Sequence, residues 1–116
     1  ILAVLKSLAP RTQITGLAHI TGGGLRDNIE RILPQDCRLA IDRNTWPTPP
    51  VFTWLQGLGD IEREEMFRVF NMGIGYTLVV KKRSAKAMQK RLAKHHIASW
   101  IIGQIVAGER GVECTN

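Results

Sequence analysis

The stretch His19-Ile20-Thr21-Gly22-Gly23-Gly24-Leu25 decides the fold of this chain, because its three consecutive glycines separate two different hydrophobic patterns. The apolar run over residues 14–20 predicts a strand, and residues 25–33 place apolar side chains at helical spacing. The glycines therefore lie on a strand-to-helix turn. Such a turn presents free backbone N–H groups at the start of a helix, where an anion is favoured. Because glycine has no Cβ, a ligand can also approach the backbone closely. The alternative is a tight turn that only needs positive φ.

The composition is that of one soluble, globular domain of 116 residues, 44% hydrophobic and 22% charged. No apolar run approaches the roughly 18 residues of a membrane span, so we expect no membrane partner. Cys37 and Cys114 are isolated and lack metal-ligand spacing, which predicts no metal site and a reducing, cytoplasmic compartment. The chain opens at Ile1 inside an apolar run, so we expect a piece of a longer protein that enters in mid-helix.

Helical and strand patterns alternate along the chain, which predicts an α/β sheet covered by helices. Ser84 precedes a basic helix and is expected to cap it. The predicted helices are 1–8, stopped by Pro10, then 25–33, 51–58, 61–70 and 84–95. The predicted strands are 14–20, 37–41, 76–80, 98–106 and the edge strand 111–115.

Aromatic side chains are expected in the core rather than in a site. Trp54, Phe67 and Phe70 lie at helical spacing among apolar neighbours. Trp54 also belongs to the stripe of an amphipathic helix, which is formed by Val51, Trp54, Leu55 and Leu58.

A second glycine-bearing turn, Asn71-Met72-Gly73-Ile74-Gly75, joins the predicted helix 61–70 to the predicted strand 76–80. Ligands of α/β proteins tend to bind where strands end, so we expect the two turns to converge at one end of a sheet. Asn71, Gly73 and Gly75 then either contact a ligand or let two backbones pack closely, and the sequence leaves both open.

Positive charge is concentrated in one segment of the chain, whose formal net charge is +6. Residues 81–96 carry seven of the sixteen Lys and Arg residues and no acidic residue. Lysines recur every fourth residue from Lys82 to Lys94 and form one stripe on the predicted helix. The stripe is either a solvated face or an electrostatic footprint for nucleic acid or an anionic membrane. No aromatic residue interleaves with it, so a nucleic-acid partner is not expected.

Taken together, these motifs resemble the aminoimidazole ribonucleotide synthases, also called phosphoribosylformylglycinamidine cyclo-ligases. The matching segments keep their order from about residue 14 to the end: 19–25, 28–34, Trp46, 50–56, 64–75 and 98–103. The chain is thereby identified as a member of that family's C-terminal domain. Residues 1–116 would form one α/β (α+β) domain with a mixed β-sheet flanked by helices, and the N-terminal ATP-binding domain is expected to be absent.

The resemblance implies an enzyme of de novo purine biosynthesis that converts formylglycinamidine ribonucleotide and ATP to aminoimidazole ribonucleotide, ADP and phosphate. Thr21, Gly22, Gly23 and Gly24 would line the nucleotide site through backbone N–H groups. His19 beside them would be a hydrogen-bond donor or proton carrier.

Asn71, Gly73 and Gly75 would add the second turn of that site. ATP and Mg²⁺ would be held mainly by the N-terminal domain, so this chain alone is expected to be inactive. The family also implies a homodimer for the complete enzyme.

Two rival interpretations remain. Related ATP-dependent enzymes, namely formylglycinamidine synthetase, selenophosphate synthetase and thiamine-phosphate kinase, share the fold but not this combination of glycine segments. The other rival is a non-catalytic anion- or nucleic-acid-binding module that uses the basic helix 82–94. It predicts a salt-dependent affinity that is lost when Lys86, Lys90 and Lys94 are neutralised. Asn28 and Arg31 either reach the site or face solvent.

Overall fold

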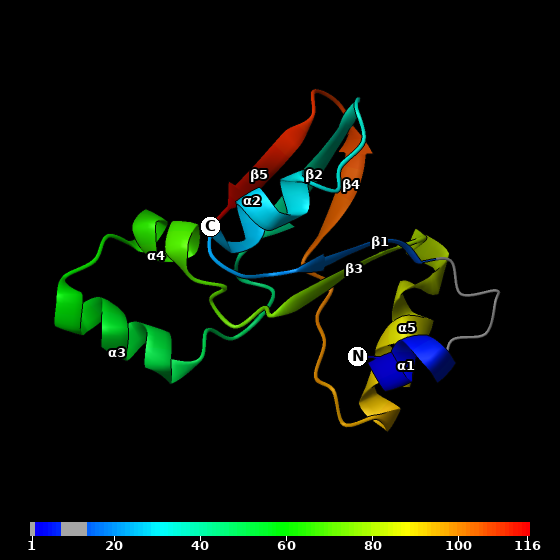
Figure 1. Cartoon of the computed structure of the whole chain (residues 1–116), viewed down its shortest axis with the longest axis horizontal. Helices are drawn as coiled ribbons and strands as arrows, with labels where there is room; N and C mark the ends of the chain where they lie inside the picture. The colour runs from blue at the N-terminus through cyan, green and yellow to red at the C-terminus, as the bar shows by residue number, and fades with distance from the viewer. Residues whose placement is uncertain (1, 8–13) are drawn as a thin grey trace. The chain divides into compact units, whose positions relative to one another are not determined.

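The computed structural model describes residues 2–7 and 14–116, which form two compact units (Figure 1). The sheet unit comprises Ala18–Thr77 and Ile102–Asn116. The small unit comprises Ile1–Leu17, of which the described residues are 2–7 and 14–17, and Leu78–Ile101. Each unit is described by itself. None of the helices in the described part of the chain is long and apolar enough to span a membrane.

The sheet unit is built on a three-stranded sheet in the order β4-β2-β5. The central strand β2 (Cys37–Asp42) pairs antiparallel with β4 (Gly103–Ala107) and parallel with β5 (Gly111–Thr115). In this register Leu39 lies opposite Ile105 on one side and Val112 on the other. The mixed sheet flanked by helices is therefore confirmed, and so is the position of 111–115 as an edge strand.

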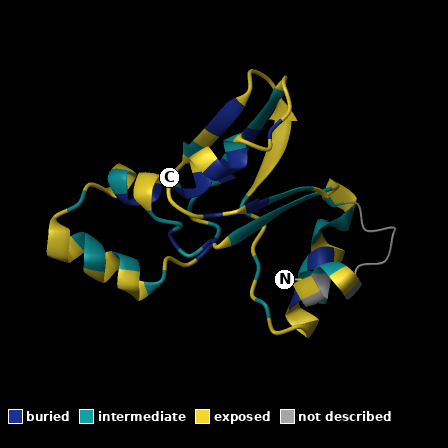
Figure 2. Ribbon diagram, in the orientation of Figure 1, coloured by how far each residue is buried: buried dark blue, intermediate teal, exposed yellow. Residues whose placement is uncertain are grey.

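Helix α2 (Gly24–Glu30) packs against β5 and against helix α4 (Arg63–Val69). Leu25, Ile29 and Leu33 are buried, as their spacing predicts, together with Leu39 and Ile41 of β2. Figure 2 shows buried segments in dark blue along α2 and the neighbouring sheet. The helix ends earlier than predicted, because residues 31 and 32 leave it as a turn and Ile32 is exposed.

Helix α3 (Pro50–Gly59) begins at a proline, as expected for a residue without a backbone N–H, but most of its predicted apolar stripe is exposed. The side chain of Trp54 is 61% exposed, and Val51 and Leu58 are exposed with it. Leu55 packs against the core as predicted, and so does Phe52, which lies outside the predicted stripe. The placement of Trp54 in the core is therefore wrong, whereas Phe67 is buried and Phe70 is half-buried as predicted.

Strand β4 begins at Gly103, so the prediction of a strand from residue 98 is wrong for its first five residues. The Asp42 N–H donates to the Ile102 carbonyl, and pairing with β2 starts one residue later. A Cβ at Gly103 would lie 2.1 Å from the Ala40 carbonyl oxygen, so the close strand pairing there requires glycine.

The small unit contains α1 (Leu2–Ser7), the short 3₁₀ turn η1 (Lys82–Ser84) and α5 (Ala85–Lys94). Met88 and Leu92 of α5 are buried against Ile14, Leu78, Val80 and Ile97. Ser84 stands at the N-cap of α5 but makes no side-chain capping bond, because η1 precedes the helix directly. The predicted helix stop at Pro10 lies outside the described residues.

Strands β1 (Ile14–His19) and β3 (Tyr76–Val80) form a two-stranded pair. The hydroxyls of Thr15 and Thr77 donate to the carbonyls of Val79 and Ala18, so the partners run in opposite order and the pair is antiparallel. One end of this pair belongs to each unit. The end in the sheet unit leads directly into both glycine turns.

Candidate functional site at the two glycine turns

The two glycine turns lie side by side in the sheet unit. The Ile20 N–H donates to the Gly75 carbonyl at 3.0 Å, which joins the residue before the first turn to the last residue of the second. This bond continues the antiparallel pairing of β1 with β3. The expectation that the turns meet where strands end is therefore confirmed.

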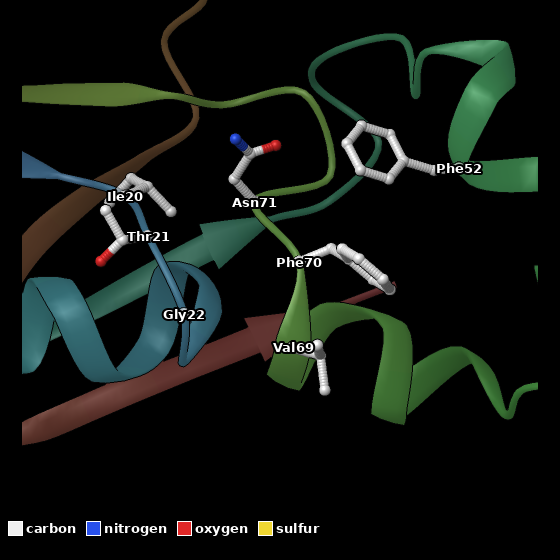
Figure 3. Close-up of a pocket in the computed structure, with 7 residues that line it drawn as sticks. All are labelled: Ile20, Thr21, Gly22, Phe52, Val69, Phe70 and Asn71. Carbon is white, nitrogen blue, oxygen red and sulfur yellow. The ribbon is translucent and has the colours of Figure 1, made fainter. Parts of the chain in front are cut away.

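A hollow of about 230 Å³ opens between the turns. Ile20, Thr21 and Gly22 line one side, and Asn71 follows helix α4 (Figure 3). The remaining wall is apolar and consists of Phe52, Val69 and Phe70. The rings of Phe52 and Phe70 contact each other with centroids 5.9 Å apart. The hollow thus joins a polar backbone edge to an aromatic wall.

Gly23 and Gly24 both have the left-handed backbone conformation, with φ of 96° and 63°. A Cβ at Gly24 would lie 2.1 Å from the Phe67 carbonyl oxygen, so this glycine lets the turn pack against the end of α4. The Gly24 N–H donates to the Thr21 carbonyl at 3.1 Å. This N–H, which the sequence assigned to a ligand, is therefore already engaged.

The N–H groups of Gly22 and Gly23 donate no backbone hydrogen bond to any residue in the described ranges. Gly22 lines the hollow, and a Cβ built on it would meet no atom within 4 Å. The open part of the turn is therefore centred on Gly22.

Asn28 holds the inner side of this turn, a role that sequence reasoning left undecided. Its residue is only 6% exposed, and its Nδ2 donates to the carbonyls of Thr21, Gly22 and Gly24 at 3.3, 3.2 and 2.8 Å. Its Oδ1 accepts the hydroxyl of Thr21 at 3.3 Å. One feature of the sequence could have indicated this role: Asn28 is a polar residue three positions after Leu25, inside an otherwise apolar helical stripe.

The second turn is held mainly by its own contacts. The Gly73 N–H donates to Asn71 Oδ1 at 3.0 Å, and Gly73 has a φ of 103°. A Cβ at Gly73 would lie 2.6 Å from Pro49 Cδ, so a larger residue does not fit. The buried indole of Trp46 donates to the Met72 carbonyl at 3.0 Å and secures the turn from the core side.

Asn71 and Gly75 occupy the open side of the second turn. Asn71 lines the hollow, and its Nδ2 makes no hydrogen bond to another residue within the described segments. Gly75 is exposed, and a Cβ built on it would meet no atom within 4 Å.

His19 does not line the hollow. Its side chain is exposed, and its ring stacks on Tyr76 with centroids 6.0 Å apart and planes inclined by 26°. Arg31 is also exposed and borders a different hollow with Asp27, Glu30 and Arg110. Of the residues that the sequence singled out, the structure brings Thr21, Gly22 and Asn71 to the first hollow.

An ion pair that shifts the pKa values of both partners lies outside the hollow. Arg43 donates two hydrogen bonds to Glu64, at 2.6 and 2.9 Å, and its guanidinium lies 4.3 Å above the Phe67 ring centroid. The Glu64 hydrogen bond raises the pKa of Arg43, and the same contact lowers the pKa of Glu64. This pair ties the end of β2 to α4.

The residues at the hollow suit a phosphate better than a metal ion. They include no carboxylate, which Mg²⁺ prefers as a protein ligand. Over residues 2–7 and 14–116, no three His, Cys, Asp or Glu residues gather as a metal-ligand group. Open backbone N–H groups and an amide are donors, which fit an anionic or carbonyl oxygen.

The mixed sheet, its covering helices and the paired glycine turns define the class of protein as an α+β domain with a candidate ligand site at strand ends. Residues 1–114 match the family described as AIR synthase related protein, C-terminal domain. The chain belongs to that family.

Curated relatives that match this chain include proteins named phosphoribosylformylglycinamidine cyclo-ligase. The protein of Pseudothermotoga lettingae is 46% identical over 100 residues, which cover 86% of this chain and 30% of that protein. That of Bacillus subtilis is 42% identical over 109 residues, covering 94% of this chain and 30% of that protein. The chain thus spans about 30% of the length of the curated relatives it matches.

Among solved structures, two of Escherichia coli HypE resemble this chain. Their TM-scores are 0.72 and 0.73, both at 18% identity, and one is described as a hydrogenase maturation protein. They cover 99% and 98% of this chain and 34% and 35% of the HypE chains. At this identity the likeness establishes the fold.

Proposed function

We propose that this chain supplies part of the ribonucleotide site of a phosphoribosylformylglycinamidine cyclo-ligase in de novo purine biosynthesis. The complete enzyme would convert formylglycinamidine ribonucleotide and ATP to aminoimidazole ribonucleotide, ADP and phosphate. One observation carries the proposal: Asn71 lies far from Thr21 and Gly22 in the sequence, yet all three line one hollow in a chain of this family. The names of the relatives supply the reaction.

The glycine turn would bind a phosphate group of the ribonucleotide or of ATP. The N–H groups of Gly22 and Gly23 are the donors that would hold it, while Gly24 would keep the turn seated on α4. An anion is favoured there because charge-assisted hydrogen bonds are stronger than neutral ones. Asn71 Nδ2 would donate to a second oxygen of the ligand.

The aromatic wall would receive an uncharged part of the ligand. A phosphate is expensive to bury against Phe52 and Phe70, whereas a ribose or formamide is not. Turn and wall would together orient the ribonucleotide, and such positioning is a major component of catalysis.

The chemistry would proceed in two displacements. The formamide oxygen attacks the γ-phosphorus of ATP and ADP leaves; the amidine nitrogen then attacks the activated carbon, the phosphate leaves and the ring closes. His19 would serve as hydrogen-bond donor or proton carrier, with Tyr76 holding its ring. Gly73 would keep Asn71 at the hollow through its N–H bond to Asn71 Oδ1, and Gly75 would hold the second turn against the first through its bond from Ile20.

ATP would be a substrate shared with the part of the enzyme outside the matched region. The carboxylates that Mg²⁺ needs would also come from there, because the hollow has none. We propose a homodimer for the complete enzyme and a cytoplasmic location. The chain alone would be inactive.

Amide NMR of the 116-residue chain, titrated with formylglycinamidine ribonucleotide with and without ATP, tests the proposal. Shifts clustered at 21–24 and 71–75 are expected. Gly22→Ala should weaken them, because its methyl would occupy the open mouth of the turn. Gly57→Ala is the matched control, since that glycine also has no atom within 4 Å of a built Cβ but does not line the hollow.

Binding elsewhere would contradict the proposal. Shifts confined to residues 82–94, and reproduced by any polyanion, would favour the alternative module that uses the basic helix. Lys86, Lys90 and Lys94 are exposed on α5, whereas Met88 and Leu92 are buried, which is also the pattern of an ordinary solvated face.

A further inference from the structure

We infer that Asn28 is a positioning residue that directs the N–H groups of Gly22 and Gly23 toward the phosphate. The inference rests on the proposed function, because it concerns the same site. It adds which two donors face the ligand and which side chain orients them.

The geometry begins with the burial of Asn28. Its Nδ2 donates to the Gly24 carbonyl at 2.8 Å and to the Gly22 and Thr21 carbonyls at 3.2 and 3.3 Å. An amide has two N–H groups, so at least one of them is shared between two carbonyls. Its Oδ1 accepts the Thr21 hydroxyl, and Figure 3 shows the Thr21 side chain directed toward α2.

Because the peptide group is planar, these bonds to the carbonyls also fix the direction of the N–H groups that follow them. In a trans peptide the C=O of one residue and the N–H of the next point in opposite directions. The carbonyls of Thr21 and Gly22 both point to Asn28. The N–H groups of Gly22 and Gly23 therefore point away from Asn28. Gly22 lines the hollow, whereas Gly23 lies beside the Asp27 carboxylate, whose Oδ2 is 2.8 Å from a Cβ built on Gly23.

The neighbouring N–H groups are excluded by their own bonds. The Gly24 N–H is engaged by the Thr21 carbonyl, and the Asp27 N–H by the Gly23 carbonyl. The ligand oxygen is therefore received by two consecutive N–H groups rather than by the dipole of α2, which spans only seven residues. The chemical class is a phosphate monoester or a phosphoryl oxygen.

A primary amide meets all the demands of this position. An ionised aspartate would place acceptor oxygens against three carbonyls, and a leucine would leave those carbonyls without a donor in a buried place. A protonated aspartic acid has one O–H donor and would restore part of the hydrogen bonding to the three carbonyls.

The test compares Asn28→Asp with the wild-type chain by ribonucleotide titration at about pH 5 and about pH 9, because burial against carbonyl oxygens raises the pKa of a carboxyl. Wild type should bind at both. Asn28→Asp should bind on the order of tenfold more weakly than wild type at the higher pH, and recover at the lower pH as the acid becomes a donor. Asn44→Asp, at an exposed position of the same unit, is the charge-matched control and should follow wild type.

A second pair of variants covers the case in which Asn28→Asp does not fold. Thr21→Val removes the hydroxyl that donates to Asn28 Oδ1, and Thr21→Ser retains it. Serine should bind more tightly than valine, and valine should lose severalfold with the Gly22 and Gly23 amide signals displaced. Equal affinity of all these variants at both pH values would overturn the inference and leave the proposed function standing. Absence of binding by the wild-type chain itself would overturn the proposed function, and the inference with it.

Discussion

Replacing Gly24 by alanine should destabilise the sheet unit strongly, although it adds one methyl group. The new Cβ would lie 2.1 Å from the Phe67 carbonyl oxygen and 3.1 Å from that of Phe70, both of them backbone atoms. Gly24 also has a φ of 63°, which disfavours any residue with a Cβ. The methyl group therefore meets two independent penalties.

The expected loss follows from these two penalties. The left-handed backbone costs alanine about 1 kcal/mol, and forced overpacking costs a further ~1–3 kcal/mol. A loss of roughly 2–4 kcal/mol is a large part of the roughly 5–15 kcal/mol by which native domains are stable. The turn should also shift away from α4, because the Phe67 carbonyl belongs to that helix.

Urea unfolding followed by the fluorescence of buried Trp46 measures this loss. The background should carry phenylalanine at Trp54 and Trp100, whose exposed rings would add a signal unrelated to the core. Gly22→Ala is the matched control, because the neighbouring position has neither a left-handed φ nor an atom within 4 Å of a built Cβ. A stable Gly24→Ala, or an equal loss in Gly22→Ala, would refute the reasoning.

Three further predictions concern the surroundings of the site. Glu64→Gln should make the free energy of unfolding fall less steeply as the pH is lowered. Arg43 lowers the pKa of Glu64, so the ionised pair stabilises the fold at neutral pH and this stabilisation is lost as the pH falls through the lowered pKa. The loss of stability should stay below about 1 kcal/mol because Glu64 is exposed. Unfolding of the wild-type and variant proteins across an acid pH series measures it. Trp46→Phe should cost about 1–3 kcal/mol by leaving the Met72 carbonyl unpaired, measured by thermal unfolding monitored by circular dichroism. The lysine stripe of α5 is neutralised by Lys86→Gln, Lys90→Gln and Lys94→Gln. These changes should leave the ribonucleotide-induced NMR shifts unchanged. A loss of those shifts would favour the polyanion-binding alternative.

Much of the fold was predictable because it depends on local patterns. The strand before the three glycines, the helix after them and strands β2, β3 and β5 follow from side-chain spacing and turn residues. Strand β4 was predicted too long, since residues 98–102 are as apolar as a strand but only Gly103–Ala107 lie beside β2. An apolar run shows that a segment can form a strand, and the partner decides where it begins.

Helix α3 shows the same limit for burial. Its sequence has two overlapping apolar faces that share Leu55: one adds Phe52, and the other is the predicted stripe with Val51, Trp54 and Leu58. The packing of the unit partly buries Phe52 and Leu55 and exposes Val51, Trp54 and Leu58. Spacing predicts that a helix forms, but when both faces are apolar it cannot choose between them.

The features of the site also fall into those that the sequence determined and those that only the tertiary structure decided. The sequence by itself determined the two glycine turns, because glycine at positions of positive φ or close approach is a local requirement, and it determined the family through the order of its motifs. Only the tertiary structure decided that the turns share a hollow, that the Gly24 N–H is engaged and that Asn28 braces the turn. Those outcomes depend on which groups distant chain segments bring within hydrogen-bonding distance, and no local pattern contains that information.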